Sequence, residues 1–382
     1  MRFDWHELSV STRRAGAVGV IALVVAVVGG WFDPDAFFEA WLVTWVFIVG
    51  LALGGMMIVM IHELTGGKWG LVLRPPLEAA MLSLPLVALL GIPLLFGLSH
   101  LFEWARPEAV DARYVLRAKH WFLNVPGFVV RNIAWLAIWS GFAMALARRL
   151  RTGDTATRKQ IAVAALIVYF LTVTLFAYDW IASLVPDWNS TAIGVRLGAA
   201  QFLAAFAFTL CLAHFQDAST TAMSEATRHD LQDFGNLLLT FCMFWAYIAY
   251  TQFFIVWGED LPREIAWYWP RVRTSWQWLA LAVLAIEFVV PFVAMLFRAL
   301  KRDSRRLTLV AAIVLAGAWL DCLWLITPSL HPGGFTVHWL HFVALLAEGG
   351  LWLAFVLATM RQLPTPITAP ESNASDKANA HG

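Results

Sequence analysis

Long apolar stretches, separated by short polar segments, run through almost the whole chain. A helix needs about 20 predominantly apolar residues to cross the hydrocarbon core of a bilayer. A transmembrane β-barrel is excluded, because its strands are only ~10 residues long and alternate in polarity. The pattern therefore predicts an all-α integral membrane protein with ten spanning helices, at residues 15–32, 37–60, 77–101, 122–147, 161–185, 195–214, 234–257, 275–297, 307–328 and 338–360.

Small residues and prolines interrupt several of these predicted helices. Gly50 and Gly54 are four residues apart in the second helix, an arrangement that lets a neighbouring helix approach closely. Pro85 and Pro93 fall in the third helix, and Pro291 falls in the eighth. Breaks of this kind are tolerated where protein surrounds them, and they often line a cavity.

Lysine and arginine are distributed unequally over the predicted loops. Eighteen lie on the side of the two termini, and seven lie on the opposite side. Because positive charge accumulates on the cytoplasmic side of membrane proteins, both termini are predicted to be cytoplasmic, including residues 1–14. Residues 361–382 are polar and rich in Pro, Ser and Ala, which predicts a disordered cytoplasmic tail.

The composition narrows the possible functions further. The chain is 60% hydrophobic and 14% charged, with a net charge of +1, so no nucleic-acid partner is expected. Its cysteines, Cys211, Cys242 and Cys322, fall in three separate spans, which supports neither a disulfide framework nor an iron–sulfur site. No Ser-His-Asp arrangement, P-loop or dinucleotide fingerprint is present. We therefore predict no catalytic residue and no metal site in this chain.

Six charged residues nevertheless fall inside the predicted spans: Arg131, Asp179, Arg196, Glu287, Asp321 and Glu348. Each charge near the bilayer centre costs at least about 2.5 kcal/mol, so such residues are rare and usually functional. A chain that only anchored itself in lipid would not need them. They indicate that the protein handles protons, ions or a polar headgroup within the membrane.

Depth along the helices, at about 1.5 Å per residue, sorts the polar groups into three layers. The outer layer holds Asp179, Arg196, Asp321, His338 and His341. Near the midplane lie Arg131, Glu287 and Glu348. The inner mouth is formed by His62, Glu63, Glu78 and His214.

These layers predict two kinds of site. Histidines and carboxylates in the outer layer can bind a quinol headgroup and accept its protons, which makes the five outer residues candidates for quinone binding. Carboxylates that continue inward resemble a proton path. Its candidate members are His62, Glu63, Glu78, Arg131, Asp179, His214, Glu287, Asp321 and Glu348.

Simpler interpretations exist for some of these residues. Arg131 or Arg196 could hold two helices together through an ion pair, with Asp179 or Glu287 as the partner. Interfacial carboxylates need no functional explanation; they include Glu39, Glu63 and Glu78. Haem ligation is the alternative for the histidines, by His62 with His214 or by His100 with His341, but nothing in their spacing requires it.

Several segments of the chain are similar to one protein family. The most specific is HDLQDFGNLLLTFCMFWAYIAYTQFFIVWGEDLPREIAWY, at residues 229–268. Others are IHELTGGKWG (61–70), KHWFLNVPGFVVRNIAWLAIW (119–139), FAYDWIASLVPDWNSTAIGV (176–195) and PFVAMLFRALKRDSRRL (291–307). They resemble the ActF-type membrane subunits of bacterial alternative complex III, a quinol:cytochrome c oxidoreductase, within the NrfD-like (polysulfide reductase) family.

The resemblance implies a fold and a setting. Two four-helix bundles, at about residues 37–185 and 195–330, are flanked by the first and last helices, which would place the residues of helix 338–360 away from the central path. The resemblance also implies a subunit of the bacterial inner membrane with no redox cofactor of its own, although quinol or quinone could bind it. Its partners would be a homologous quinol-oxidising membrane subunit, an iron–sulfur protein, c-type cytochromes that carry haem c and, in some complexes, a terminal oxidase.

Carried onto matching positions, the family favours His62, Glu63, Arg131, Asp179 and Asp321 as functional residues. Arg196 departs from the family, which has an aromatic residue there, and we expect it to pair with Asp179. The implied role is proton translocation, quinone-site support and assembly of the complex. A stand-alone secondary transporter and a purely structural membrane anchor are the alternative functions.

Overall fold

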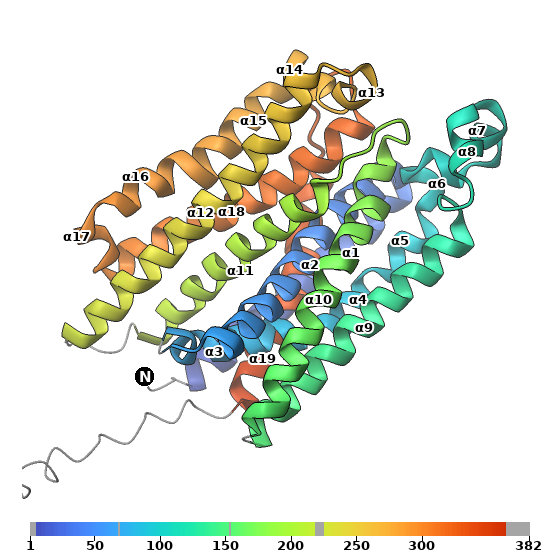
Figure 1. Cartoon of the computed structure of the whole chain (residues 1–382). Helices are drawn as coiled ribbons and strands as arrows, with labels where there is room; N and C mark the ends of the chain where they lie inside the picture. Colours follow the sequence, from blue (N-terminus) through green and yellow to red (C-terminus); the bar gives the residue numbers. More distant parts are fainter. Residues whose placement is uncertain (1–4, 68, 153, 218–224, 364–382) are drawn as a thin grey trace, which may run out of the picture.

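A computed structural model describes residues 5–67, 69–152, 154–217 and 225–363 of the 382-residue chain. Every regular element within these residues is a helix (Figure 1). Nine of the helices in this part of the chain are long and apolar enough to cross a membrane. They are α1 (Trp5–Phe32), α2 (Pro34–Thr65), α9 (Val125–Thr152), α10 (Thr155–Trp180), α11 (Ile193–Asp217), α12 (Glu225–Glu259), the segment Trp276–Leu296, α18 (Ser304–Leu330) and α19 (Leu340–Gln362).

The remaining predicted span is broken. Residues Leu73–Leu82 and Leu84–Phe96 meet at an angle of 43° and make a tenth span if they are counted together. Its pieces are α3 (Trp69–Leu82), α4 (Leu84–Leu90) and α5 (Ile92–Phe96). The segment Trp276–Leu296 is also divided, into α15 (Trp276–Leu284), a π-helical turn η3 (Ala285–Val289) and α16 (Val290–Leu296). The prediction of an all-α membrane protein is confirmed.

Short helices between the spans lie mainly at one end of the molecule, here called the loop end (Figure 1). The loop end carries α6 (Leu98–Leu101), η1 (Glu103–Ala105), α7 (Pro107–Ala112), α8 (Tyr114–Lys119), η2 (Ala182–Leu184), α13 (Pro262–Ile265) and α14 (Trp269–Arg273). The opposite end, here called the terminal end, carries α17 (Arg298–Lys301) and both ends of the described chain. Such an arrangement fits an even number of crossings.

Polar residues fix where several spans begin. The carboxylate of Asp33 accepts a hydrogen bond from the backbone N–H of Ala36 at 3.1 Å, and Pro34 follows at the first position of α2. Asp154 and Asp303 cap α10 and α18 in the same way. These side chains satisfy backbone donors that the first helical turn leaves free. The capping positions therefore separate helix from loop at points that hydrophobicity alone does not define.

Helix α2 lies at the centre of the fold, and its most apolar 18-residue window is completely buried. It packs against α3, α10, α11, α18 and α19 (Figure 1). The contact with α11 is very close, because a Cβ added to Gly54 would lie 2.1 Å from the carbonyl oxygen of Gln201. The close approach predicted from Gly50 and Gly54 is confirmed, since both glycines face Gln201.

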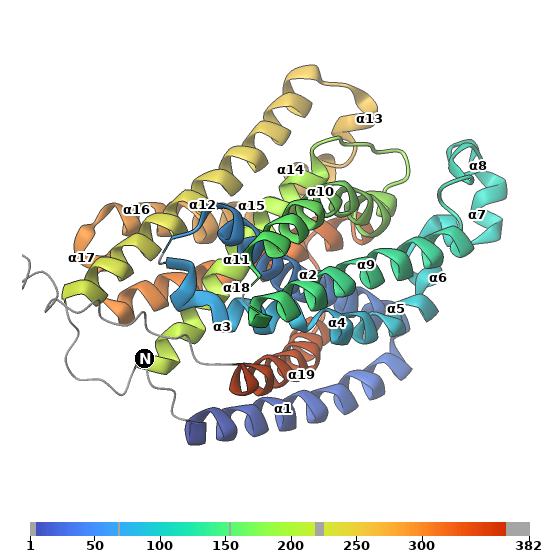
Figure 2. The same cartoon turned by 60° about the horizontal axis from the view of Figure 1, so that its bottom comes forward.

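The other helices are grouped around α2. Helices α3, α4 and α10 pack against α2, and α9 packs against these three helices, whereas α11, α12, α15, α16 and α18 form a second group. Helices α1 and α19 pack mainly against each other along one side of the molecule (Figure 2). However, α19 also packs against α2 and α3, so its inner face belongs to the core.

The broken third span lines a cavity, as its prolines predict. A cavity of about 450 Å³ lies between this span and α9, and its lining includes Pro85, Gly91, Asn132 and Trp180. Two backbone carbonyls of this broken span accept hydrogen bonds from tryptophan side chains of α2. Trp45 donates a hydrogen bond to the carbonyl of Val87, and Trp41 donates one to the carbonyl of Leu90, both at 2.8 Å.

Candidate functional site

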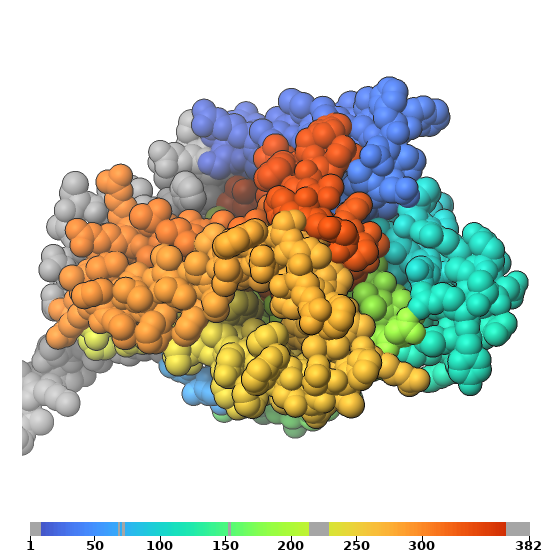
Figure 3. Space-filling view, turned by 90° about the horizontal axis from the view of Figure 1, so that it is seen from above, coloured from blue at the N-terminus to red at the C-terminus, as the bar shows by residue number. Residues whose placement is uncertain are grey.

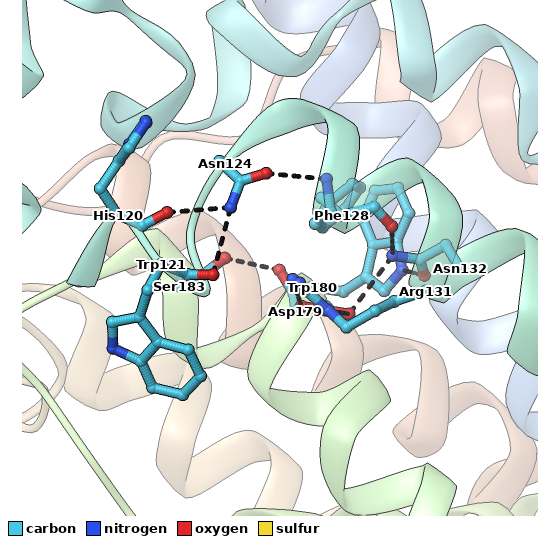
Figure 4. Close-up of polar contacts among 10 residues, drawn as sticks. His120, Trp121, Asn124, Phe128, Arg131, Asn132, Asp179, Trp180 and Ser183 are labelled. Atoms are coloured by element: carbon cyan, nitrogen blue, oxygen red, sulfur yellow. Dashed lines mark hydrogen bonds and ion pairs between the residues drawn. The ribbon is translucent and has the colours of Figure 1, made fainter.

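The first buried ion pair joins α9 to α10 near the loop end. Arg131 binds both carboxylate oxygens of Asp179, with Nη2–Oδ1 at 2.7 Å and Nε–Oδ2 at 3.2 Å (Figure 4). Asp179 is completely buried, and the guanidinium of Arg131 lies 3.9 Å from the ring centre of Phe122. A bidentate pair of this kind is strong and geometrically specific.

Neighbouring groups complete this cluster (Figure 4). The amide nitrogen of Asn132 donates to the carbonyl of Phe128 at 2.9 Å and lies 3.4 Å from Oδ2 of Asp179. The amide oxygen of Asn132 accepts from the indole of Trp180, and the hydroxyl of Ser183 donates to the backbone carbonyl of Asp179. Both carboxylate oxygens of Asp179 thus have partners, which agrees with the interpretation of Arg131 as an ion-pairing residue that holds helices together.

The second buried ion pair lies between α11 and α18. Nη2 of Arg196 is 2.6 Å from Oδ1 of Asp321, and both side chains are almost fully buried. The guanidinium carbon lies 5.4 Å from the ring centre of Trp324. The expected pair between Arg196 and Asp179 is therefore wrong: α11 turns this side chain toward α18, and Arg131 already occupies Asp179.

Glu287 lies beside the second pair, in the π-helical turn η3. A π-turn inserts an extra residue into a helix and is frequent at functional sites. Pro291, four residues later, has no N–H to donate to the carbonyl of Glu287, so the regular α-helical bond is impossible there. A Cβ added to Gly317 would lie 2.6 Å from Cγ of Glu287, so α18 accommodates this side chain only because Gly317 has none.

Arg196, Asp321 and Glu287 form a group of three in which two acidic side chains share one basic side chain. Glu287 is completely buried, neither of its carboxyl oxygens has a hydrogen-bond partner among the described residues, and it interacts electrostatically with both other groups. One guanidinium can balance only one carboxylate. An additional bare carboxylate in such surroundings costs far more than a neutral carboxyl. The group of three therefore has one carboxyl group more than its single guanidinium can balance, and Glu287 is the one without a partner among the described residues.

Residues of the predicted inner mouth lie at the terminal end, where they form ion pairs. Glu63 binds Arg74, and its other oxygen lies 3.2 Å from Nε of Arg158. Glu78 is buried, with one oxygen unpartnered among the described residues and with Arg74 nearby. His62 instead shapes the adjacent loop, since its Nε2 lies 2.9 Å from the carbonyl oxygen of Gly67. His214 belongs to α11, but its side chain lies outside the described residues.

The three predicted site residues near and within α19 differ in how deeply they are buried. Glu348 is completely buried, and neither carboxyl oxygen has a hydrogen-bond partner among the described residues. His341 is 1% exposed, whereas His338 is half-buried. The family-based expectation that this helix lies away from the core fails for its inner face, because Trp352 on that face donates a 2.7 Å hydrogen bond to Ser83 in the broken span.

Two buried residues, Glu39 and Arg271, were not among the functional residues predicted from the sequence. Glu39 was placed at the water interface but is only 4% exposed; it binds His331 at 2.7 Å and faces His341 at 3.6 Å. The hydrogen bond to Glu39 raises the pKa of His331, which lies just outside the spans. Arg271 is completely buried in a loop segment and donates hydrogen bonds to the carbonyls of Trp324 and Leu325.

Comparison with known proteins adds no assignment: no protein-family model and no curated protein matches the chain.

Within the described residues, no group of three or more His, Cys, Asp or Glu side chains is arranged to hold a metal ion. A cavity of about 300 Å³ close to the Arg131–Asp179 pair is lined by Phe122, Tyr178 and Ser183 among others. The group of three around Glu287 remains the strongest candidate site.

Proposed function

We propose that this chain is a membrane subunit of a respiratory quinol:cytochrome c oxidoreductase of the alternative complex III type, and that it contributes proton translocation. The single observation that carries the proton role is Glu287, a buried carboxyl group that has no hydrogen-bond partner among the described residues and lies beside the Arg196–Asp321 pair. The resemblance of residues 229–268 and four further segments supports the setting. In this proposal the chain lies in the bacterial cytoplasmic membrane with both termini in the cytoplasm.

Electron transfer belongs to other subunits in this proposal. The chain binds no redox cofactor of its own, and its partners are a homologous quinol-oxidising membrane subunit, an iron–sulfur protein and c-type cytochromes. It also provides surface for assembly and supports the quinone site. Intramembrane carboxylates that can exchange a proton are the usual parts of such a relay.

The proposed proton step uses the imbalance within the group of three. While Glu287 is protonated, Arg196 and Asp321 balance each other. When Glu287 loses its proton, Arg196 faces two carboxylates and its free Nη1 provides a donor for the second. Protons would reach Glu287 from the terminal end, where Glu63, Glu78, His62 and His214 mark the mouth, and would leave toward the loop end.

A secondary transporter is the second candidate function. It is favoured by one observation: Arg196 Nη1 and Asp321 Oδ2 are both buried and have no partner among the described residues, so they could bind a small polar substrate or a coupling ion. Co-purification distinguishes the two functions, because a transporter should be isolated alone and colourless. A purely structural anchor accounts for Arg131 and Asp179 but not for Glu287, whose carboxyl group has no partner in the part of the chain that the structure describes.

The experiment begins with an affinity tag on the C-terminus and purification in a mild detergent. A visible spectrum with haem c bands, together with an iron–sulfur subunit and a second membrane subunit, supports the proposed complex; a solitary colourless chain overturns it. The complex is then reconstituted in vesicles and the protons moved per electron are measured. Glu287→Gln should lower this ratio while quinol oxidation continues. Glu103→Gln should not, because this half-exposed carboxylate at the loop end only pairs with Arg113.

A further inference from the structure

Three acid–base side chains from distant parts of the sequence meet at the loop end. Glu39 comes from the first turns of α2, His331 follows the last residue of α18, and His341 lies in the first turn of α19. Oε2 of Glu39 is 2.7 Å from Nε2 of His331, and Oε1 is 3.6 Å from Nε2 of His341. This group is here called the outer triad. In Figure 3 the segment that joins α18 to α19 lies at the surface of this end, beside the blue N-terminal helices.

The outer triad runs from water into the protein. The side chain of His331 is 44% exposed, whereas those of Glu39 and His341 are 5% and 1% exposed. The backbone of His331 is held in place because its carbonyl accepts a 2.8 Å hydrogen bond from the indole of Trp276. A proton can therefore reach His331 directly from water, whereas His341 is closed off from water and contacts Glu39.

The contacts of His341 determine which of its ring nitrogens carries the hydrogen in the neutral form. Nδ1 lies 3.1 Å from the backbone carbonyl oxygen of His338, and a carbonyl can only accept, so Nδ1 carries the hydrogen. In the neutral ring Nε2 is then an acceptor, and it faces Oε1 of an ionised Glu39, which is also an acceptor. Neither atom has a hydrogen-bond partner among the described residues. Two acceptors therefore face each other, and a hydrogen bond between them requires one additional proton.

The buried end of the same helix face carries Glu348. It is seven residues after His341, which places both side chains on one face of α19, about 10 Å apart along the axis. Both oxygens of Glu348 lack partners within the described residues, and the carboxyl group is completely buried. Of the described residues, Asp33 and Glu39 are the ionisable groups that act on His331, and Glu39 is the one paired with His341.

We propose that the outer triad is a proton-exchange site that connects Glu348 with water at the loop end. This inference rests on the proposed role in proton translocation and adds an outer station to it, on a helix outside the two bundles. Nε2–H of neutral His331 donates to Oε2 of Glu39, so a proton from water binds Nδ1 of the ring and the Nε2 proton moves to Oε2 of Glu39, which becomes a carboxylic acid. The acid group turns and gives the proton to Nε2 of His341. His341, now protonated on both nitrogens, releases the Nδ1 proton toward Glu348 and is left neutral with its hydrogen on Nε2, while Glu39 is again a carboxylate; a turn of the imidazole ring restores the hydrogen to the Nδ1 position.

The exchange of hydrogen for deuterium at Glu348 tests this proposal on the purified full chain. The C=O stretching band of a protonated carboxyl group shifts when its proton is replaced by deuterium, and the band of Glu348 is identified by its loss in Glu348→Gln. After transfer to heavy water, we expect Glu39→Gln to slow this shift at least tenfold. His331→Gln, a change at a half-exposed position that leaves the core intact, should slow it as well.

The chain offers two controls. Asp35 and His100 form a similar carboxylate–histidine pair at 2.6 Å on the same end, but both side chains are exposed, so Asp35→Asn should leave the exchange rate of Glu348 unchanged. The band of Glu287 should also exchange at its usual rate in Glu39→Gln. Equal exchange rates of Glu348 in the parent and in both triad variants would overturn the proposal, and so would an equal slowing by Asp35→Asn.

This experiment fails or succeeds independently of the proposed function, because it needs no partner subunit. If the exchange depends on the outer triad but no complex moves protons, the site stands and the respiratory role falls. If the complex moves protons and Glu39→Gln changes neither the exchange rate nor the protons moved per electron, the outer triad is not part of the path.

Discussion

Arg196 binds Asp321 through only one contact, with Nη2 at 2.6 Å from Oδ1, and leaves Nη1 and Oδ2 buried without partners among the described residues. Arg131 by contrast binds both oxygens of Asp179. The two pairs thus differ in completeness although their residue types are the same. The complete pair holds α9 against α10, whereas the incomplete pair retains a donor and an acceptor beside Glu287, which suits proton exchange.

The first prediction concerns the coupling between Glu287 and Asp321. In Asp321→Asn, Glu287 can lose its proton and balance Arg196, so the cost to the free energy of unfolding is moderate. In the double variant with Glu287→Gln, Arg196 has no counter-charge, and we expect the loss to exceed the sum of the single losses by about 1–3 kcal/mol. Chemical unfolding in detergent micelles measures the cycle. Additive losses would show that the two carboxyl groups are independent.

The second prediction compares two glycines. Gly54→Ala should destabilise the protein by about 1–3 kcal/mol, because the new methyl group meets the backbone oxygen of Gln201 and must push α11 away from α2. Gly141→Ala, in α9, meets no atom within 4 Å and should be neutral or stabilising by up to about 1 kcal/mol. Thermal unfolding of both variants tests the difference. Equal effects would mean that the close packing of α2 on α11 does not limit stability.

The spans, the break in the third helix and the close glycine contact were predictable, because each depends on local sequence. Hydrophobic length fixes a span, Pro85 and Pro93 prevent a continuous helix, and Gly54 permits close approach. These features require no knowledge of which helices are neighbours.

The partners of the buried charges were not predictable in the same way. Arg196 and Asp321 are 125 residues apart, and Glu39 and His331 are 292 apart, so their pairing depends on the rotation and neighbours of whole helices. Glu39 carries no local signal, since a carboxylate near the start of a span usually faces water. The π-turn at Glu287 had a partial signal in Pro291, which shows where a helix is disturbed but not in which direction the side chain turns.

The third prediction follows from the raised pKa of His331. A histidine whose pKa is higher in the folded protein stabilises it fully below the unfolded value of about 6.5, and this contribution disappears as the pH rises through the folded value. The melting temperature of the parent should therefore exceed that of His331→Gln most at acidic pH, with a smaller difference at alkaline pH. His120→Gln, at an exposed position, should show no such trend. A difference that grew with pH would contradict the Glu39–His331 bond.

The last prediction explains why a completely buried arginine is present in a loop segment. Pro328 in α18 has no N–H for the carbonyl of Trp324, and Nε of Arg271 donates to that carbonyl instead at 3.2 Å. Arg271→Met should cost about 2–4 kcal/mol, because it leaves buried carbonyls unpaired. Pro328→Ala restores an N–H to the helix, so in the Arg271→Met background it should recover about 1 kcal/mol, whereas alone it should gain little, since the carbonyl of Trp324 already has a donor. A double-mutant cycle of unfolding free energies measures this recovery. An equal effect of Pro328→Ala in both backgrounds would show that Arg271 does not replace the missing backbone donor.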